Sequence, residues 1–213
     1  MKRLRILLAD DHSMVSAGFQ KLLEPEYEVA GVVEDGRAVL KAAAELKPDM
    51  AILDVGMPLL NGLDAGRRLK ELMPEIKLIY LTMNSDPDFA KEALEIGASA
   101  YLLKNSMPSE LLQAVRDVAK GKSYITPQIA QALDEAFIRD PRDVTRPKHL
   151  TSRQREILQM LAEGRSMKEI ANILNITHRT VRFHKAQIME ELGIHSHMEL
   201  LQYAIKHGMV SST

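Results

Sequence analysis

The sequence predicts a doubly wound α/β domain followed by a small all-helical domain. In the first half of the chain, short apolar runs alternate with longer stretches whose apolar residues follow helical spacing. Apolar runs of strand length without polar alternation are typical of parallel strands that are covered on both faces. After Leu150 only helical spacing remains. The 213 residues are enough for two small domains of this kind.

Five apolar runs are expected to form one parallel sheet. Each run is too short for a helix, and turn formers or charged residues flank most of them. Their alternation with helical stretches gives five strand–helix units, which is typical of a doubly wound domain. The runs are Leu4–Ala9, Val29–Val33, Met50–Leu53, Leu78–Leu81 and Ala100–Leu103.

Amphipathic stretches lie between and after these runs. Their apolar or small residues recur three or four positions apart, so they line up on one side of a helix. We expect these stripes to pack against the two faces of the sheet. The clearest stripes lie within Val15–Leu23, Leu63–Met73, Phe89–Gly97 and Leu111–Val118.

The pattern fades between the two predicted domains. We expect a first domain over residues 1–124, a linker over 125–149 and a helical domain over 150–213. Part of the linker, Gln128–Ile138, has helical spacing. The segment Arg139–Lys148 that follows holds two prolines and six charged residues, which is typical of a solvated connection.

Capping signals mark the helices of the last domain. In a capping box, a Ser or Thr before the helix is followed three residues later by Glu or Gln. Gly164 and Gly208 lie where the helix C-caps are expected. The three boxes are formed by Thr151 with Gln154, Ser166 with Glu169, and Ser196 with Glu199.

The composition excludes several classes of protein. The chain has no cysteine, which rules out disulfides, thiolate catalysis and cysteine-ligated zinc and fits a reducing compartment. No stretch approaches the ~20 apolar residues that cross a bilayer, and the first apolar run is too short for a signal peptide. We therefore expect a cytoplasmic protein without membrane contacts. Its formal net charge of -1 hides a local basic patch between Arg165 and Lys185.

Polar side chains follow four of the predicted strands at their carboxyl ends. Asp10 and Asp11 follow the first strand, Asp54 the third, Thr82 the fourth and Lys104 the fifth. Open parallel sheets bind ligands beyond these ends, and in the common order 2-1-3-4-5 the binding crevice lies between strands one and three. Three converging carboxylates need a cation, and Mg²⁺ takes such ligands together with a phosphate. A hydroxyl and a lysine beside them suit a phosphoryl group carried on a carboxylate.

These residues make the first domain resemble a response-regulator receiver. The resemblance implies the strand order 2-1-3-4-5 and a phosphoryl group that Asp54 accepts from a sensor histidine kinase. The matching positions are Asp10 and Asp11, Asp54 within the segment Leu53–Pro58, Gly62, Thr82, Gly97 with Ala98, and Lys104.

The same resemblance implies a Mg²⁺ site. Asp11, Asp54 and the backbone carbonyl of Gly56 would hold the ion, and Asp10 would assist through water. The neighbouring His12 is interpreted as a surface residue.

The resemblance also assigns roles at the other strands. Thr82 and Lys104 would bind the phosphoryl oxygens. Tyr101 matches the position of an aromatic switch that turns inward on activation. Asn105 departs from the proline that many receivers have after this lysine, and receivers joined to the output domain described next often lack it.

The segment from Ser166 to Glu190 predicts a helix-turn-helix. A helix over Met167–Leu174 is followed by a tight turn at Asn175–Thr177 and by a second helix that exposes a basic face. Such a helix fits the major groove of DNA, where Arg donates two hydrogen bonds to guanine. Contacts to phosphate fix the register on DNA without reading its sequence. We expect Arg179, Arg182, Phe183 and Ala186 on the exposed face, and Lys168 and Thr180 near phosphate.

Residues 150–210 resemble the LuxR-type helix-turn-helix. With the receiver, this resemblance identifies the chain as a member of the NarL/FixJ class of response regulators, in which the last helix, here about His197–His207, pairs two subunits. Met167, Glu191 and His197 depart from the usual pattern, and Glu191 is expected to repel phosphate. The matching segments are Leu150–Leu158, Gly164, Ser166–Ala171, Thr180–His184 and Leu192–Ile194.

The expected function is phosphorylation-controlled transcription regulation, not metabolic catalysis. The expected partners are a sensor histidine kinase, double-stranded DNA, a second copy of the chain on activation and RNA polymerase. Two alternatives stay open at this point. The same fold would serve a phosphorylation-independent regulator, and Asp10, Asp11, Asp54 and Mg²⁺ would serve a phosphohydrolase. Phosphatases with an aspartate nucleophile usually carry it on the first strand in an Asp-x-Asp pattern, which this chain lacks.

Overall fold

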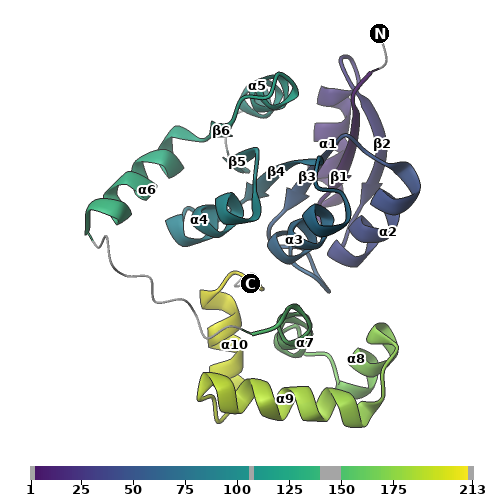
Figure 1. Cartoon of the computed structure of the whole chain (residues 1–213), viewed down its shortest axis with the longest axis vertical. Helices are drawn as coiled ribbons and strands as arrows, with labels where there is room; N and C mark the ends of the chain where they lie inside the picture. Colours follow the sequence, from purple (N-terminus) through teal and green to yellow (C-terminus); the bar gives the residue numbers. More distant parts are fainter. Residues whose placement is uncertain (1–2, 106–107, 140–149, 211–213) are drawn as a thin grey trace.

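The N-terminal part of the protein is built around one parallel sheet. The computed structural model describes residues 3–105, 108–139 and 150–210. The strand order is β2-β1-β3-β4-β5-β6, and every pair in it is parallel (Figure 1). The strands are β1 (Arg5–Ala9), β2 (Glu28–Val33), β3 (Met50–Asp54), β4 (Lys77–Thr82), β5 (Ala100–Leu103) and β6 (Tyr124–Ile125).

Helices cover both faces of this sheet, as the apolar runs predict. One core cluster lies between the sheet and α2, α3 and α4, and the other lies between the sheet and α1 and α5. The central strand β3 is buried along its whole length, because both faces are covered. The helices are α1 (Ser13–Leu23), α2 (Gly36–Leu46), α3 (Gly62–Leu72), α4 (Pro87–Ile96) and α5 (Pro108–Ala119).

The predicted order of five strands, 2-1-3-4-5, is confirmed, and the short strand β6 adds a sixth at the edge beside β5. Tyr124 and Ile125 pair with Ala100 and Tyr101 of β5. A strand of two residues gives no periodic pattern, so the sequence alone does not show it. It leads into α6 (Pro127–Arg139), which lies beside α4 and buries Ile129 in the core cluster of that face (Figure 1). The segment 140–149, which belongs to the expected linker, lies outside the described residues.

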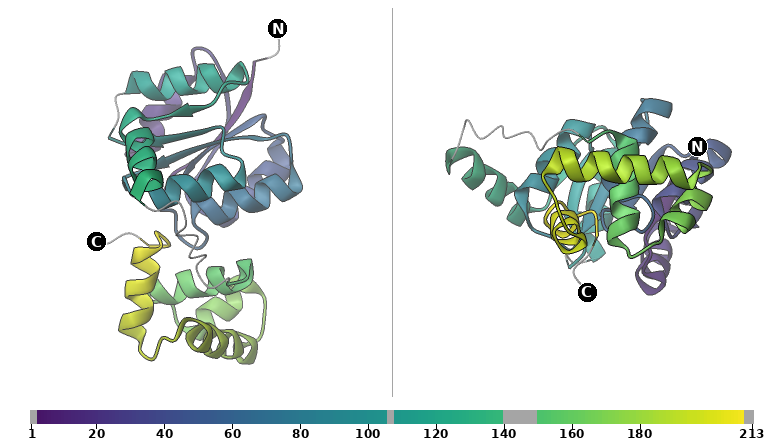
Figure 2. Two further views of the ribbon diagram at one scale, coloured as in Figure 1. Left: turned by 60° about the vertical axis from the view of Figure 1, so that its left-hand side comes forward. Right: turned by 90° about the horizontal axis from the view of Figure 1, so that it is seen from below.

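The C-terminal part is all helical and has a core of its own. Its helices pack around Ile157, Leu158, Ile170, Val181 and Leu200. In the right-hand view of Figure 2, α9 crosses in front of the other elements, on the side that faces away from the sheet. The helices are α7 (Ser152–Ala162), α8 (Met167–Leu174), α9 (His178–Leu192) and α10 (His197–Lys206).

Two of the three expected capping boxes are complete. At α7 and α8 the Ser or Thr side chain accepts from the third amide of the helix, and the Gln or Glu side chain accepts from the capping residue's amide. At α10 the Ser196 hydroxyl accepts from the amide of Glu199, but the Glu199 carboxylate accepts from the amide of His195. The expected third box is therefore incomplete, because the Glu199 carboxylate bonds to the amide of His195 and not to that of Ser196. None of the helices in the described part of the chain is both long and apolar enough to cross a membrane.

Gly62 is a position where a side chain is expected to be costly. A Cβ there would lie 2.1 Å from the Asp54 carbonyl oxygen, and backbone cannot move aside easily. We expect Gly62→Ala to lower the free energy of unfolding by about 1–3 kcal/mol. The exposed helical Gly18 has nothing within 4 Å of its Cβ position, so Gly18→Ala is expected to raise stability by about 0.4–1 kcal/mol. Urea unfolding of both variants measures the contrast, and equal stabilities would contradict the close approach at Gly62.

Candidate functional site

The polar groups at the strand ends lie together at one edge of the sheet, as predicted. Asp10 and Asp11 follow β1, Asp54 ends β3, Thr82 ends β4 and Lys104 follows β5. A cleft of about 370 Å³ opens between these ends, and its lining includes Asp54, Gly56, Thr82 and Lys104. The parallel direction of the strands brings these residues together, because all the carboxyl ends lie at one edge of the sheet.

Lys104 joins two of the carboxylates. Its Nζ atom lies 2.9 Å from Oδ2 of Asp10 and 2.6 Å from Oδ2 of Asp54. All three side chains are buried, with 5%, 0% and 5% of their surface exposed. Burial raises the pKa of the Asp54 carboxyl above its ordinary value, and the Lys104 ammonium opposes this rise. The lysine therefore favours the ionised carboxylate, which is the form that acts as a nucleophile.

The acidic residues also fit a divalent cation. One ligand atom from each of Asp10, Asp11, His12 and Asp54 lies within 4.8 Å of the others. The Asp10 Oδ2 atom is buried and, despite its ion pair with Lys104, has no hydrogen-bond partner. Clustered carboxylate oxygens with one exposed member, Asp11, are the donors that a partly hydrated Mg²⁺ prefers.

His12 has closer contacts than the interpretation as a surface residue implied. Its side chain is 63% exposed, yet Nδ1 lies 3.2 Å from Oδ1 of Asp10 and 2.9 Å from Oδ1 of Asp11. Its backbone amide also donates to Oδ1 of Asp10. The imidazole therefore sits at the rim of the acidic cluster, and sequence position alone does not show which way it turns.

Backbone amides of the loop after β3 order this loop beside Asp54. The Gly56 amide donates to Oδ1 of Asp54 over 3.1 Å, and the Gly62 amide donates to the carbonyl of Val55. The hydroxyl of Thr82 accepts from the amide of Asn84, which orders the loop after β4. The predicted metal and phosphoryl ligands Gly56 and Thr82 thus border the same cleft as Asp54.

Tyr101 points into the protein. It is fully buried in the cluster that contains Phe89 of α4 and Ile129 of α6. Burial raises the pKa of its phenol, so the hydroxyl stays protonated at neutral pH. The predicted switch residue is therefore already in the inward position.

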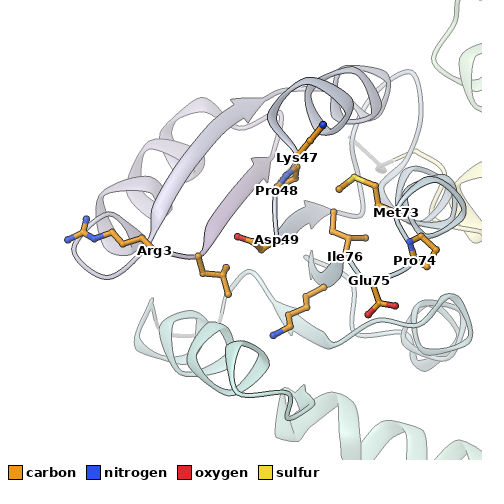
Figure 3. Close-up of a pocket in the computed structure, with 10 residues that line it drawn as sticks. Arg3, Lys47, Pro48, Asp49, Met73, Pro74, Glu75 and Ile76 are labelled. Atoms are coloured by element: carbon orange, nitrogen blue, oxygen red, sulfur yellow. The ribbon is translucent and has the colours of Figure 1, made fainter. Parts of the chain in front are cut away.

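A second hollow lies at the opposite edge of the sheet and is remote from this chemistry (Figure 3). It is lined by residues near the amino ends of β1, β3 and β4, including Lys47, Asp49 and Glu75. Asp49 already accepts a hydrogen bond from the Arg5 amide. The lining mixes charges of both signs, and we assign it no function.

The helix-turn-helix forms where it was predicted. Asn175 ends α8 in a left-handed conformation with φ of 51°, and the Thr177 hydroxyl accepts from the amide of Thr180 at the start of α9. The predicted residues Arg179, Arg182, Phe183 and Ala186 are all exposed, and Phe183 is 58% exposed although it is aromatic.

The remaining residues predicted at this face differ in their surroundings. Lys168 is exposed near the start of α8. Thr180 is half-buried, and its hydroxyl lies 2.8 Å from that of Thr177. Glu191 accepts a hydrogen bond from Nε2 of Gln154 over 3.2 Å. The carboxylate that was expected to repel phosphate is therefore turned toward α7 and is only partly exposed.

Comparison with known proteins gives two family matches. Residues 6–116 match the response regulator receiver domain, and residues 148–204 match the bacterial regulatory proteins of the luxR family. The oxygen regulatory protein NreC of Staphylococcus aureus is 36% identical over 215 residues, which cover 97% of this chain and 99% of NreC.

Solved structures agree with these matches. The response regulator RcsB of Salmonella typhimurium has 28% sequence identity and a TM-score of 0.60 over 95% of this chain and 98% of its own. A LuxR-family two-component response regulator from Aurantimonas sp. has 32% identity and a TM-score of 0.61 over 65% of this chain and 99% of its own. RcsB has also been solved as two dimers bound to two parallel DNAs, with 28% identity and a TM-score of 0.59 over 95% of this chain and 98% of that one.

Proposed function

Because the chain belongs to the response regulators that join a receiver domain to a LuxR-type regulatory domain, we propose that phosphorylation of Asp54 controls its binding to DNA. The observation that carries the proposal is the pairing of two features in one chain. In the receiver, Oδ2 of the buried Asp54 lies 2.6 Å from Nζ of Lys104. In the other domain, α9 has an exposed face that carries Arg179 and Arg182. The match to regulatory proteins also leaves the phosphohydrolase alternative without support.

In the proposed phosphoryl transfer, each of these side chains has one role. An Asp54 carboxylate oxygen attacks the phosphorus of a phosphohistidine on a sensor kinase, and the P–N bond breaks as its electron pair leaves with the imidazole. Lys104, which contacts Oδ2 of Asp54, binds a phosphoryl oxygen as the new bond forms. The Thr82 hydroxyl at the same cleft donates to another. Asp10, Asp11, Asp54 and the Gly56 carbonyl would hold Mg²⁺, which would neutralise negative charge there when bound.

Loss of Asp11 is expected to weaken Mg²⁺ binding strongly. Asp11→Ala removes the exposed carboxylate of the cluster, and the number of charged ligands sets much of a site's affinity. Isothermal titration of Mg²⁺ into the wild type and into Asp11→Ala measures the change. Asp134→Ala, an exposed acid on α6, serves as the control and is expected to leave the affinity unchanged. Equal affinities in all three proteins would contradict the ligation.

DNA recognition is assigned to α9 and its surroundings. Arg179, Arg182, Phe183 and Ala186 would face base edges in the major groove. Lys168 and Thr180 would contact phosphate. Support comes from the exposure of the first four residues on one helix and from the RcsB dimers bound to DNA.

The proposed assembly is a homodimer on DNA. The last helix, α10, would pair two subunits, and RNA polymerase would be contacted at the promoter. A receiver, a DNA-binding domain and the absence of cysteine fit action in the cytoplasm. The RcsB structures include a complex with promoter DNA in the presence of the phosphomimetic BeF3⁻.

The proposal is tested first on the isolated helical domain. Residues 150–213 have their own core in the described part, so this fragment is expected to fold and to bind DNA at low salt without phosphorylation. Selection from a random duplex library followed by gel shift measures binding, and circular dichroism checks the fold. A folded fragment that binds no duplex would contradict the assignment of DNA binding to this domain.

A further inference from the structure

Phe183 is an aromatic side chain that lies in water on a basic helix. It is 58% exposed, and no other aromatic residue is among the exposed large apolar side chains of residues 3–105, 108–139 and 150–210. A single exposed apolar residue is common on protein surfaces and does not by itself indicate a partner. The position of Phe183 on α9 and the residues around it distinguish it from such cases.

The core of the C-terminal domain determines on which side of α9 the ring lies. Val181 and Ile188 are the buried residues of this helix. With about 3.6 residues per turn, Phe183 lies on the side opposite to both of them. Arg179 and Ala186 share that side and are also exposed. The ring therefore points away from the core, on the face that is proposed to meet base edges.

The receiver contacts the C-terminal domain through other helices. On α7, Nε2 of Gln159 donates to the carbonyl of Met57 over 2.9 Å, and its Oε1 accepts from the amide of Asn61 over 2.8 Å. After α10, Gly208 packs so closely on the ring of Phe89 that no room is left for a Cβ. Helix α9 lies on the side of its domain that faces away from the sheet (Figure 2). Its exposed face is therefore accessible in the full chain.

The surroundings of the ring favour a polyanion over an apolar protein partner. The segment His178–Gln187 has three residues of the Arg and Lys type and no acid. The exposed neighbours of Phe183 one helical turn away are Arg179, Ala186 and Gln187, so no apolar patch continues from the ring. Cations bind phosphates on either side of a DNA groove. The small side chain of Ala186 leaves room for the ring to approach the bases.

A neighbouring residue limits the orientation of the ring. The rings of Phe183 and His184 meet edge to face, with centroids 5.9 Å apart and planes at 62°. This is a favoured geometry for two aromatic rings. His184 is half-buried, so it holds the more exposed ring of Phe183 in place. A side chain that is already ordered loses less conformational entropy when it binds.

The major groove offers a phenyl ring one kind of apolar group. Base edges there carry hydrogen-bond donors and acceptors, and only thymine adds an apolar substituent, its C5-methyl group. Against adenine, guanine or cytosine, a ring would cover polar groups without replacing their hydrogen bonds to water, which is unfavourable. The chemistry of the side chain therefore selects a C5-methyl group. 5-Methylcytosine carries the same group.

We propose that Phe183 recognises the C5-methyl group of a pyrimidine in the DNA site. Thymine presents this group in unmodified DNA, and 5-methylcytosine presents it in methylated DNA. The inference rests on the function proposed above and specifies a base that α9 reads. Arg182 precedes Phe183 and is turned by about 100° around the helix, so it contacts a different base. Each half-site therefore combines a guanine that is read by hydrogen bonds with a methylated pyrimidine that is read by an apolar contact.

The test removes the methyl group and nothing else. A duplex is selected from a random library with the full-length protein, both with and without beryllofluoride and Mg²⁺. Each thymine is then replaced in turn by uracil, and fluorescence anisotropy gives the Kd. At one position of a half-site, uracil should weaken binding by about fourfold, which is the effect of one buried carbon. Uracil in both half-sites of a dimer should weaken it by roughly fifteenfold.

Two variants show whether Phe183 is the residue that senses the methyl group. Phe183→Ala is too short to reach the base, so thymine and uracil should give the same Kd. Leu72→Ala truncates another exposed apolar side chain, on α3 of the receiver, and should keep the fourfold effect. Because Phe183 is exposed, its truncation should not change the fold, and thermal unfolding of both variants checks this. A methyl effect of the same size in Phe183→Ala would overturn the proposal.

A second arm of the test distinguishes the two sources of the methyl group. A C·G pair replaces the T·A pair at the sensitive position, and the cytosine is then methylated at C5. Methylation should tighten binding of the wild type by about fourfold and leave Phe183→Ala unaffected. A cytosine whose methylation changes nothing, at a position where uracil does weaken binding, would restrict the recognised base to thymine and overturn the wider proposal.

The outcomes also separate this inference from the proposed function. A protein that prefers its selected duplex but binds thymine and uracil equally at every position has lost the methyl contact and kept its proposed function. A methyl effect at a Kd that beryllofluoride does not change keeps the contact and contradicts control by phosphorylation. A full-length protein that selects no duplex in either condition contradicts both.

Discussion

Asp54→Ala is expected to abolish phosphate acceptance completely. The wild type, incubated with acetyl phosphate and Mg²⁺, should be retarded on a phosphate-affinity gel, and the variant should run as the untreated protein. The reason is that Asp54 supplies the carboxylate on which the phosphoryl group is carried, and Lys104 Nζ stands 2.6 Å from that carboxylate. The other two acids, Asp10 and Asp11, both follow β1 and are proposed to hold the cation.

The control for this result is Asp134→Ala, an exposed acid on α6. It should shift as fully as the wild type. Full retardation of Asp54→Ala would mean that another residue accepts the phosphoryl group, and it would contradict the proposed regulation.

Arg182→Ala and Lys168→Ala are expected to weaken DNA binding in different ways. Arg182 is exposed on the same helix as Phe183 and Ala186. Loss of a bidentate contact to guanine should cost about 1–3 kcal/mol and relax the preference at one base position. Lys168, near the start of α8, should contact the DNA backbone. Its loss should weaken binding about equally on all sequences and lower the salt slope by roughly one unit.

Fluorescence anisotropy on a selected site, on its single-base variants and across a salt series distinguishes the two effects. Exposed Lys21, on α1 of the receiver, provides a matched control as Lys21→Ala. If Arg182→Ala lowers affinity uniformly and Lys168→Ala alters base preference, then α9 is oriented differently from the proposal.

The main architecture could be predicted because strands that are buried on both faces appear in the sequence as short, wholly apolar runs. Runs such as Met50–Leu53 are wholly apolar, since helices cover both faces, and the sheet of the structure confirms the predicted order of the first five strands. The short β6 could not be predicted, because two residues carry no period. The incomplete capping box at α10 could not be predicted from the sequence either. The Glu199 carboxylate can accept from the amide of Ser196 or from that of His195, and the sequence does not show which bond forms.

The acidic cleft was predictable for a related reason. Once the strands are known, Asp10, Asp54 and Lys104 must lie at one edge. The contact between the domains was not predictable in the same way. Glu156, Gln159 and Glu163 form a polar stripe along α7 at helical spacing, and such a stripe normally faces water. The one signal available in the sequence was Leu59, an apolar residue in a loop. In the structure its backbone is left-handed, and its side chain packs against the core of the C-terminal domain.

We propose that the state of Asp54 sets the affinity of the whole chain for DNA. The most direct measurement is the Kd of the full-length protein for a selected duplex with two half-sites, with and without beryllofluoride and Mg²⁺. The wild type is expected to bind at least fivefold more tightly with beryllofluoride, and Asp54→Ala is expected to show the same Kd in both conditions. A wild type whose Kd does not change, although beryllofluoride occupies its site, would contradict the account and would favour a regulator that acts without phosphorylation.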